Sequence, residues 1–264
     1  MTKIQMINIE INGKKIEAPE GTTVLEAARK EGIDIPTLCY HRALGPKGVC
    51  RLCIVEIEGP GLDHMVTTSC NCRVSEGLFV ETATARIQGM RKVILNLLLS
   101  GTASTSPLKA LAGSAGIRRR KYGTVEEDKC ILCGLCVYVC RESIKAGALR
   151  FETAGDNGNR VVEFVALSEE LCIGCGTCAA LCPVGAIRLV DEGAERSVLL
   201  YGKVANTLRL KTCEECGGHY TTEKFAESIL YHLDKELRKG VKNLCPDCAR
   251  QHYVVALTGQ FLVG

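Results

Sequence analysis

The stretches CILCGLCVYVC (Cys130–Cys140) and CIGCGTCAALCP (Cys172–Pro183) repeat one cysteine spacing within the same chain. In each stretch, three cysteines follow one another at every third residue, and a fourth comes four residues later. Three thiolates on one tight loop can face a single centre. The fourth begins a turn that leads away, so it reaches a different centre. This repeat decides the fold of the middle of the chain.

The spacing C-x2-C-x2-C-x3-C is the signature of the two-cluster bacterial-type ferredoxin, in which the fourth cysteine of each run binds the other cluster. It therefore predicts two [4Fe–4S] clusters with exchanged ligands. One is expected to take Cys130, Cys133, Cys136 and Cys182, and the other Cys172, Cys175, Cys178 and Cys140. The alternative is a disulfide framework or a pair of zinc sites, which two identical runs disfavour.

Cysteine content and charge narrow the class of protein. The chain has 264 residues, 17 of them cysteine, and a net charge of +3. We expect no secretory signal and no membrane span, since the longest apolar run is Val93–Leu99. Thiols stay reduced in the cytosol, so this composition predicts a cytoplasmic metal-binding protein. A charge so close to balance gives no bulk attraction to nucleic acid or membrane.

The N-terminal region predicts a β-grasp domain, which opens with a hairpin and a helix. Asn12-Gly13 favours a tight turn, and Thr22 or Thr23 is expected to cap the helix. The expected strands are Ile4–Ile11, Lys14–Ala18, Cys53–Glu58 and Leu78–Thr82, and the expected helices are Val24–Glu31 and Thr84–Ser100.

Four cysteines of this region share the spacing C-x10-C-x2-C-x16-C, namely Cys39, Cys50, Cys53 and Cys70. A tight C-x2-C with distant partners on such a frame favours a [2Fe–2S] cluster, and Arg42–Val49 can direct backbone N–H groups at its sulfurs. Cys72 competes with Cys70 on spacing alone. His41 and His64 lack the paired spacing of a histidine-bound cluster. The alternative is that these cysteines are buried apolar residues.

Four more cysteines form two C-x2-C pairs, Cys213, Cys216, Cys245 and Cys248. They flank a helix expected at Glu223–Lys239, which Thr221 or Thr222 caps. Two such pairs can close a tetrahedral zinc site that stabilises a domain with little core of its own. The alternative is a further iron–sulfur cluster, [4Fe–4S] or [2Fe–2S]. His219 or His252 could also replace a cysteine.

The stretch Cys39–Glu81 resembles the N-terminal region of the large iron–sulfur subunit of respiratory complex I and the matching part of [FeFe] hydrogenases. The resemblance rests on CRLCIVEIEG (Cys50–Gly59) and SCNCRVSEGL (Ser69–Leu78). Together with the two ferredoxin-type runs, residues 3–190 most resemble the diaphorase small subunit of NAD-linked [NiFe] hydrogenases and of electron-bifurcating complexes. The resemblance implies that Cys70, four residues before a valine, is the fourth ligand.

Two positions depart from that family. The segment Ser100–Tyr122 contains neither histidine nor cysteine, so the additional cluster held by one histidine and three cysteines in complex I is not expected here. Cys140 is followed by Arg141 where the family has proline, which puts the local turn in doubt but not the ligand.

The C-terminal CEECGGHYTTEKF and LCPDCARQ are similar to the zinc-ribbon-like tail of some hydrogenase and formate-hydrogenlyase subunits.

These patterns predict an α+β protein in four parts. Residues 1–83 form a β-grasp [2Fe–2S] ferredoxin-like domain, 84–124 a helix and linker, 125–192 a two-cluster [4Fe–4S] ferredoxin domain, and 193–264 a zinc-ribbon-like four-cysteine domain. Within the linker, the basic run Arg118–Lys121 is expected to face solvent or a partner. A hairpin is expected over Leu149–Ala166, with its polar tip at Gly155–Gly158.

The sequence has no motif for binding a nucleotide, a flavin or a substrate. We therefore expect a non-catalytic electron-transfer subunit of a hetero-oligomer, with one [2Fe–2S] and two [4Fe–4S] clusters. The expected partners are a flavin- and NAD(H)-binding subunit and a hydrogenase or formate dehydrogenase-type subunit. The resemblance also implies that such a complex can carry out electron bifurcation. The alternatives are a free-standing ferredoxin-like carrier and an iron–sulfur redox sensor with a nucleic-acid-binding zinc ribbon.

Overall fold

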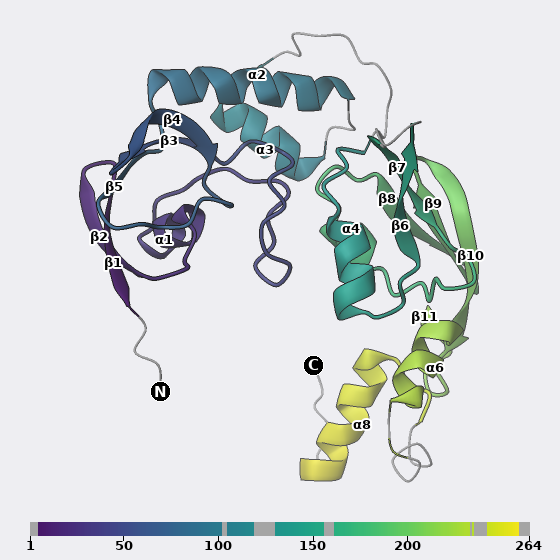
Figure 1. Cartoon of the computed structure of the whole chain (residues 1–264). Coiled ribbons are helices and arrows are strands. Elements are labelled where there is room, and N and C mark those ends of the chain that lie inside the picture. Colours follow the sequence, from purple (N-terminus) through teal and green to yellow (C-terminus); the bar gives the residue numbers. More distant parts are fainter. Residues whose placement is uncertain are drawn as a thin grey trace.

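The computed structural model describes residues 5–101, 105–118, 130–155, 161–232, 234 and 242–258. A five-stranded sheet with one helix comes first and is followed by two further helices. The two cysteine runs with a small hairpin come next, and a four-stranded sheet with two helices ends the described chain (Figure 1). None of the described helices has the length and apolar character needed to cross a membrane.

The first sheet has the topology of a β-grasp. Its strands are β1 (Met6–Ile11), β2 (Lys14–Pro19), β3 (Ile54–Gly59), β4 (Leu62–Thr68) and β5 (Leu78–Glu81). They lie in the order β2-β1-β5-β3-β4, with β1 antiparallel to β2 and parallel to β5. Asn12 and Gly13 turn between β1 and β2 with φ of 51° and 77°, as a two-residue hairpin requires.

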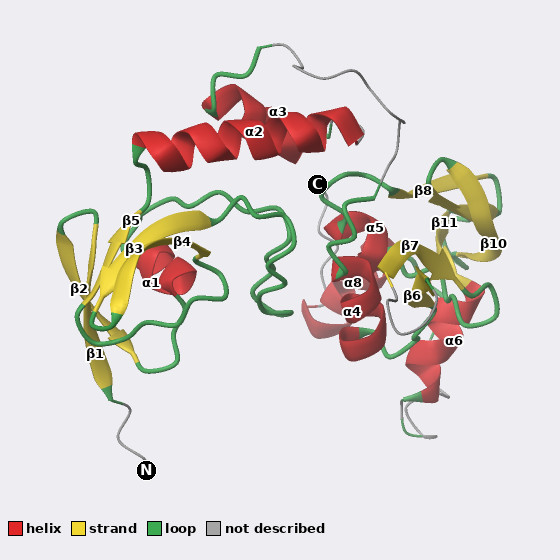
Figure 2. Ribbon diagram, turned by 45° about the horizontal axis from the view of Figure 1, so that its top comes forward, coloured by secondary structure: helices red, strands yellow, loops and turns green. Residues whose placement is uncertain are grey.

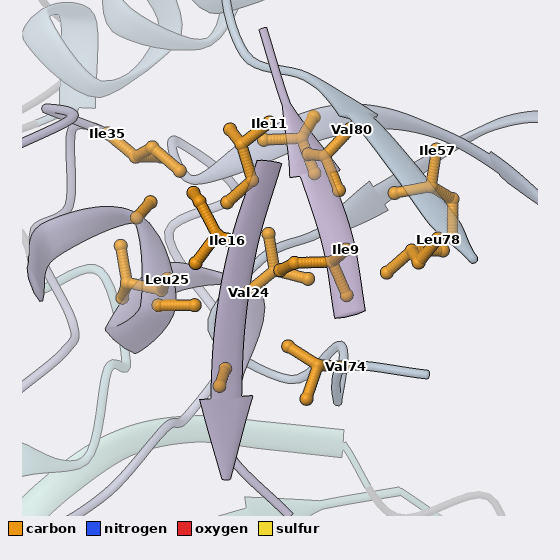
Figure 3. Packing of buried hydrophobic residues seen from close by; sticks show 14 of the residues in the cluster. Ile9, Ile11, Ile16, Val24, Leu25, Ile35, Ile57, Val74, Leu78 and Val80 are labelled. Carbon is orange, nitrogen blue, oxygen red and sulfur yellow. The ribbon is translucent and has the colours of Figure 1, made fainter. Parts of the chain in front are cut away.

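Helix α1 (Val24–Lys30) packs on this sheet and forms the N-terminal core with it. Val24 and Leu25 are completely buried and lie among Ile9 and Ile11 of β1 (Figure 3). The alternating strand and the helix thus place their apolar residues on one shared interface, as their sequence periods predict.

The edge strand β4 is not predicted by the sequence. Its side chains from Leu62 to Met65 are exposed, so it lacks the alternation that marks a half-buried strand. It forms because its backbone pairs with β3 from Ile54–Thr68 to Ile57–Met65.

Helix α2 (Ala85–Gly101) lies where the sequence predicts a helix, and helix α3 (Ser106–Ser114) replaces part of the expected linker. Leu108 and Ala112 of α3 are buried in the same apolar cluster as Leu95 of α2. The segment is rich in small residues and so resembles a linker, but the burial of its two spaced apolar positions stabilises a helix.

The two cysteine runs lead into short helices, α4 (Leu135–Tyr138) and α5 (Thr177–Leu181). Helix α4 continues into a wider π-helical turn, η1 (Val139–Ser143). The predicted hairpin between the runs is present as β6 (Leu149–Ala154) and β7 (Val161–Leu167). Residues 156–158 of its tip and residues 119–121 of the basic run lie outside the described residues.

The second sheet has the order β11-β10-β9-β8. Its strands are β8 (Ile187–Glu192), β9 (Glu195–Leu200), β10 (Lys203–Thr212) and β11 (His219–Thr222). Strands β8 and β9 form a hairpin, because Gly193 (φ 57°) permits a tight turn between them. The sequence predicts a domain boundary between residues 192 and 193, which lies within this hairpin. Helices α6 (Glu223–Tyr231) and α8 (Pro246–Thr258) follow. Residues 233 and 235–239 of the expected helix lie outside the described residues.

The sequence leaves the cap of α1 open between two threonines, and the structure assigns it to Thr23. The Thr23 hydroxyl accepts from the Glu26 N–H, and the Glu26 carboxylate accepts from the Thr23 N–H. This reciprocal pair satisfies two backbone donors at the start of the helix.

We expect Thr23→Ala to lower the free energy of unfolding by about 1 kcal/mol, because it removes the N-cap. Thr22→Ala is the matched control and should change it by less than about 0.5 kcal/mol. Chemical denaturation followed by circular dichroism measures both variants. Equal losses would show that the cap of α1 is not what Thr23 contributes.

Candidate metal centres

The four N-terminal cysteines come from one loop and two strand ends. Cys39 and Cys50 lie in the loop between α1 and β3, Cys53 directly precedes β3, and Cys70 follows β4. Each has an exposed fraction of 4% or less, and none is in a disulfide. Free thiols gathered in this way are soft ligands suited to iron.

Backbone N–H groups of the loop point at these sulfurs. The Cys50 N–H donates to Cys39 Sγ over 3.3 Å, and the Gly48 N–H donates to the Cys70 sulfur. Gly48 has φ of 67°, and a Cβ there would collide with the Asn71 side-chain amide. Glycine is therefore needed for this close approach, as predicted for the wrapping loop.

The N-terminal sulfurs share protons in two pairs. The hydrogen bond from the Cys39 thiol lowers the pKa of Cys50 to about 6, and the one from Cys70 lowers the pKa of Cys53 to about 7. The pKa values of Cys39 and Cys70 are raised, chiefly because each proton is held by the partner sulfur. Two sulfurs are thus close to the thiolate form at neutral pH, and the thiolate is the form that binds metal.

Cys72 stands apart from this group. It is half-buried, its thiol lies 3.7 Å from the carbonyl oxygen of Arg73, and burial alone raises its pKa. The geometry therefore favours Cys70 over Cys72. His64 is exposed, and its Nε2 lies 3.1 Å from Oε2 of Glu58 rather than among the sulfurs.

Four cysteines surround a small hollow between the ferredoxin-type runs, namely Cys130, Cys133, Cys136 and Cys182. Most of the remaining wall is apolar and includes Val165, Ile187 and Leu200, with the Tyr201 ring among them. This is the same set that the exchanged ligand pattern assigns to one cluster.

A second hollow is lined by the other set, Cys140, Cys172, Cys175 and Cys178. Its wall is also apolar, with Leu149, Leu189 and Val198. The Ala148 N–H donates to Cys140 Sγ over 3.3 Å, so backbone as well as side chains face the sulfur. The fold thus brings the fourth cysteine of each run to the three of the other.

The two runs share an uncommon backbone conformation. Gly134 and Gly176, which precede α4 and α5, have φ of 77° and 81°. The residue that follows the second cysteine of each run is thus left-handed, and the residues that precede it, Leu132 (φ 53°) and Gly174 (φ 65°), are left-handed too. This conformation turns N–H groups inward, and the Leu132 N–H donates to Cys130 Sγ over 3.2 Å. Hydrogen bonds of this kind help set cluster potentials.

Burial determines what these hollows can hold. It raises the pKa of Cys133 and of Cys178 to about 12, and it also raises the pKa of Cys136. An apolar surrounding disfavours the thiolate, so these sulfurs lose their protons only when a positive group binds them. An iron–sulfur centre fits this set of donors.

Polar side chains that the sequence analysis did not identify lie against three of the sulfurs. The contacts are Ser69 to Cys53, Tyr201 to Cys130 and Asn206 to Cys172. The Tyr201 hydroxyl also accepts from the Val165 N–H over 2.8 Å, which holds it in place. No motif reveals these residues, because pairing within the second sheet brings Tyr201 and Asn206 to cysteines far away in sequence.

The loop that carries Cys39 and Cys50 lies beside helix α4 (Figure 2). Cys39 and Cys50 belong to the same buried apolar cluster as Cys133. The Lys47 ammonium lies over the Tyr138 ring, 3.5 Å from its centroid. The candidate [2Fe–2S] site and the first hollow are therefore neighbours in space.

The four C-terminal sulfurs form a compact group. Those of Cys213, Cys216, Cys245 and Cys248 all lie within 4.8 Å of one another. Cys216 Sγ and Cys245 Sγ are 3.8 Å apart. Zn–S bonds of about 2.3 Å give a tetrahedral edge of about 3.8 Å. Thiolates bound to different iron atoms would be further apart, because the cluster lies between them.

Backbone hydrogen bonds support this compact site. Cys213 and Cys216 lie in the turn between β10 and β11, where the Gly217 N–H donates to the Cys213 carbonyl. N–H groups of Cys216 and Cys245 lower the pKa of Cys213 to about 6. His219 lies outside this group of four, and its Nδ1 lies 3.2 Å from Thr212 Oγ1. The arrangement fits a single ion with four thiolates.

The chain matches two kinds of known domain. Residues 4–85 match the family described as "2Fe-2S iron-sulfur cluster binding domain", and residues 123–189 and 171–218 match two families described as "4Fe-4S dicluster domain". The chain carries iron–sulfur domains. The first two matches contain the N-terminal cysteines and both ferredoxin-type runs. The third contains the second run together with Cys213 and Cys216.

Relatives of this iron–sulfur chain are subunits of larger enzymes. It is 33% identical to "NADPH-Fe(3+) oxidoreductase subunit alpha" of Geobacter sulfurreducens, with 57% of this chain and 20% of that protein covered. It is 29% identical to "NAD-reducing hydrogenase HoxS subunit gamma" of Cupriavidus necator, with 52% and 66% covered. Further relatives are subunits of NADH-quinone oxidoreductase. The resemblance stated from the sequence is confirmed.

A chain in the "Crystal structure of NAD+-reducing [NiFe]-hydrogenase in the H2-reduced state" is similar in fold. It aligns with a TM-score of 0.55 and 26% identity, covering 68% of this chain and 85% of that chain. The iron–sulfur chain spans about a fifth of the length of the first curated relatives it matches.

We expect Cys70→Ala to abolish the rhombic EPR signal of a reduced [2Fe–2S] cluster, because it removes one of four converging sulfurs. Cys72→Ala is the matched control two residues away and should keep that signal. Low-temperature EPR of the anaerobically reduced chain distinguishes them. The opposite result would make Cys72 the fourth ligand.

Proposed function

We propose that this chain is a non-catalytic electron-transfer subunit of an NAD(P)-linked oxidoreductase complex. It would relay electrons between a flavin- and NAD(H)-binding subunit and a second redox module of hydrogenase or formate dehydrogenase type. The flavin needed for electron bifurcation would belong to another subunit. The proposal rests on one observation, namely that three sulfur-lined sites adjoin one another through two buried apolar clusters that meet at the first hollow.

The order of the sites follows from that packing. The N-terminal site adjoins the hollow around Cys133, since Cys50 and Cys133 share one apolar cluster. Cys136 of that hollow shares a second apolar cluster with Cys140 and Cys172 of the other. The proposed path therefore runs from the N-terminal site through the first hollow to the second.

The protein's own residues hold the sites and tune them. In our proposal the [2Fe–2S] ligands are Cys39, Cys50, Cys53 and Cys70, and the two [4Fe–4S] ligand sets are those that line the two hollows. Bound iron–sulfur clusters would supply one-electron redox chemistry. Apolar walls exclude water. N–H groups directed at sulfur stabilise the reduced state, which carries more negative charge than the oxidised state.

We assign zinc to Cys213, Cys216, Cys245 and Cys248, with a structural role. Their compact spacing supports this assignment. The end of strand β11 contacts the second hollow's loop, because the Thr222 hydroxyl, which also caps α6, donates to the Ile173 carbonyl. Lys224 Nζ donates to the carbonyls of Glu169 and Glu170 over 3.2 and 3.3 Å. A redox-inert ion here would fix the end of the second sheet against the ferredoxin-type region.

Purification of the native complex under anaerobic conditions tests the proposed function. We expect a flavin-containing partner subunit, with about ten irons and one zinc per copy of this chain. Metal analysis, flavin fluorescence and identification of the copurifying subunits provide the measurements. A solitary chain without flavin would contradict the complex. About fourteen irons without zinc would make the C-terminal site a further [4Fe–4S] cluster.

We also expect Cys133→Ala to remove one [4Fe–4S] signal and stop electron transfer from NADH through the complex, while the [2Fe–2S] signal remains. The reason is that Cys133 lines only the first hollow. EPR of the reduced complex and NADH-dependent dye reduction by its other module measure the two effects. Cys72→Ala is the control. Undiminished transfer in Cys133→Ala would contradict the proposed path.

A further inference from the structure

Arg91 of α2 reaches the segment that carries Cys53. Its Nε donates to the Leu52 carbonyl over 3.0 Å, and its Nη2 donates to the Ile54 carbonyl over 2.6 Å. One planar guanidinium thus holds the residue on each side of Cys53. A change in the position of α2 would therefore be transmitted directly to this cysteine.

In the part of the chain that the structure describes, no carboxylate lies at ion-pair distance from Arg91. Among the described residues, its hydrogen bonds go to carbonyl oxygens, and it forms no ion pair. Burial lowers its pKa, and the negative charge that opposes this effect most is that of Cys53, ahead of Asp34. Arginine stays protonated in proteins even when it is partly buried. A fixed positive charge therefore stands beside the N-terminal site.

Arg196 offers a direct comparison at the second hollow. It also binds a carbonyl of a cysteine loop, that of Gly174, over 3.0 Å. Unlike Arg91, it forms a two-pronged ion pair with Asp191, with both N–O distances at 2.7 Å. Its charge is therefore compensated within the protein, whereas that of Arg91 is left to act on the neighbouring sulfurs.

We propose that Arg91 is a positioning residue of the [2Fe–2S] site, which clamps the Cys53 segment and raises the reduction potential of that site with a charge that no ion pair neutralises among the described residues. This inference rests on the proposed function. Reduction adds negative charge to a group already held by thiolates, and a nearby cation stabilises the product more than the reactant. The residue thereby favours acceptance of an electron at the N-terminal end of the path.

The test is an EPR-monitored redox titration of the complex as purified. Arg91→Gln removes the charge and keeps a hydrogen-bond donor. At a given potential, we expect it to lower the ratio of reduced to oxidised [2Fe–2S] cluster about tenfold. For a one-electron couple this is a decrease of about 59 mV in the midpoint potential. Both [4Fe–4S] signals should keep their midpoints. An unchanged [2Fe–2S] midpoint, or an equal shift of all signals, would overturn the proposal.

Two further variants separate charge from fold. Arg91→Lys keeps the charge and loses the fork, so we expect it to retain the wild-type ratio within about threefold. Arg91→Lys also tests the proposal if the Arg91→Gln complex fails to assemble. A tenfold decrease of the reduced-to-oxidised ratio in Arg91→Lys would refute the role of charge. Arg196→Gln is the matched control and should leave the [2Fe–2S] midpoint unchanged. A wild-type complex without a [2Fe–2S] signal would instead contradict the proposed function itself.

Discussion

The cost of burying cysteine sulfur away from water governs this structure. In the two hollows, burial raises thiol pKa values so far that the sulfurs carry charge only beside a positive group. Each hollow is closed by sulfurs from both ferredoxin-type runs, so a bound centre would tie together segments far apart in sequence. Helix α5 has no buried residue of its own, and its position depends on this shared requirement.

The sites are joined by packing as well as by proximity. One apolar cluster contains the [2Fe–2S] loop, α2, α3 and the start of the first cysteine run. Helix α2 contributes leucines to that cluster and Arg91 to the Cys53 segment. The same helix therefore supports the contact between the first two sites and the charge beside one of them. The proposed relay would depend on such packing, because small changes in distance or polarity alter electron transfer.

Local patterns predicted much of the fold. The β-grasp hairpin, α1, α2 and the β6–β7 hairpin follow from alternation, turn residues and helical spacing. Strand β4 was not predicted from such patterns, because its exposed side chains show no alternation. Helix α3 was not predicted either, because its composition is that of a linker and only burial of Leu108 and Ala112 stabilises it. The pairing of β8 and β9 across an expected boundary shows that the second sheet continues the ferredoxin-type region.

The sequence by itself determined the grouping of the cysteines, because thiolate spacing along a tight turn restricts which sulfurs can share a centre. Spacing alone did not decide whether Cys70 or Cys72 is the fourth ligand of the N-terminal site. It also did not decide whether the C-terminal cysteines bind zinc or an iron–sulfur cluster. Only the tertiary structure placed Cys72 outside the N-terminal group and drew the C-terminal sulfurs within 4.8 Å. It alone brought Arg91, Tyr201 and Asn206 to the sulfurs. Contacts between distant segments depend on how helices and sheets pack, and no local pattern encodes them.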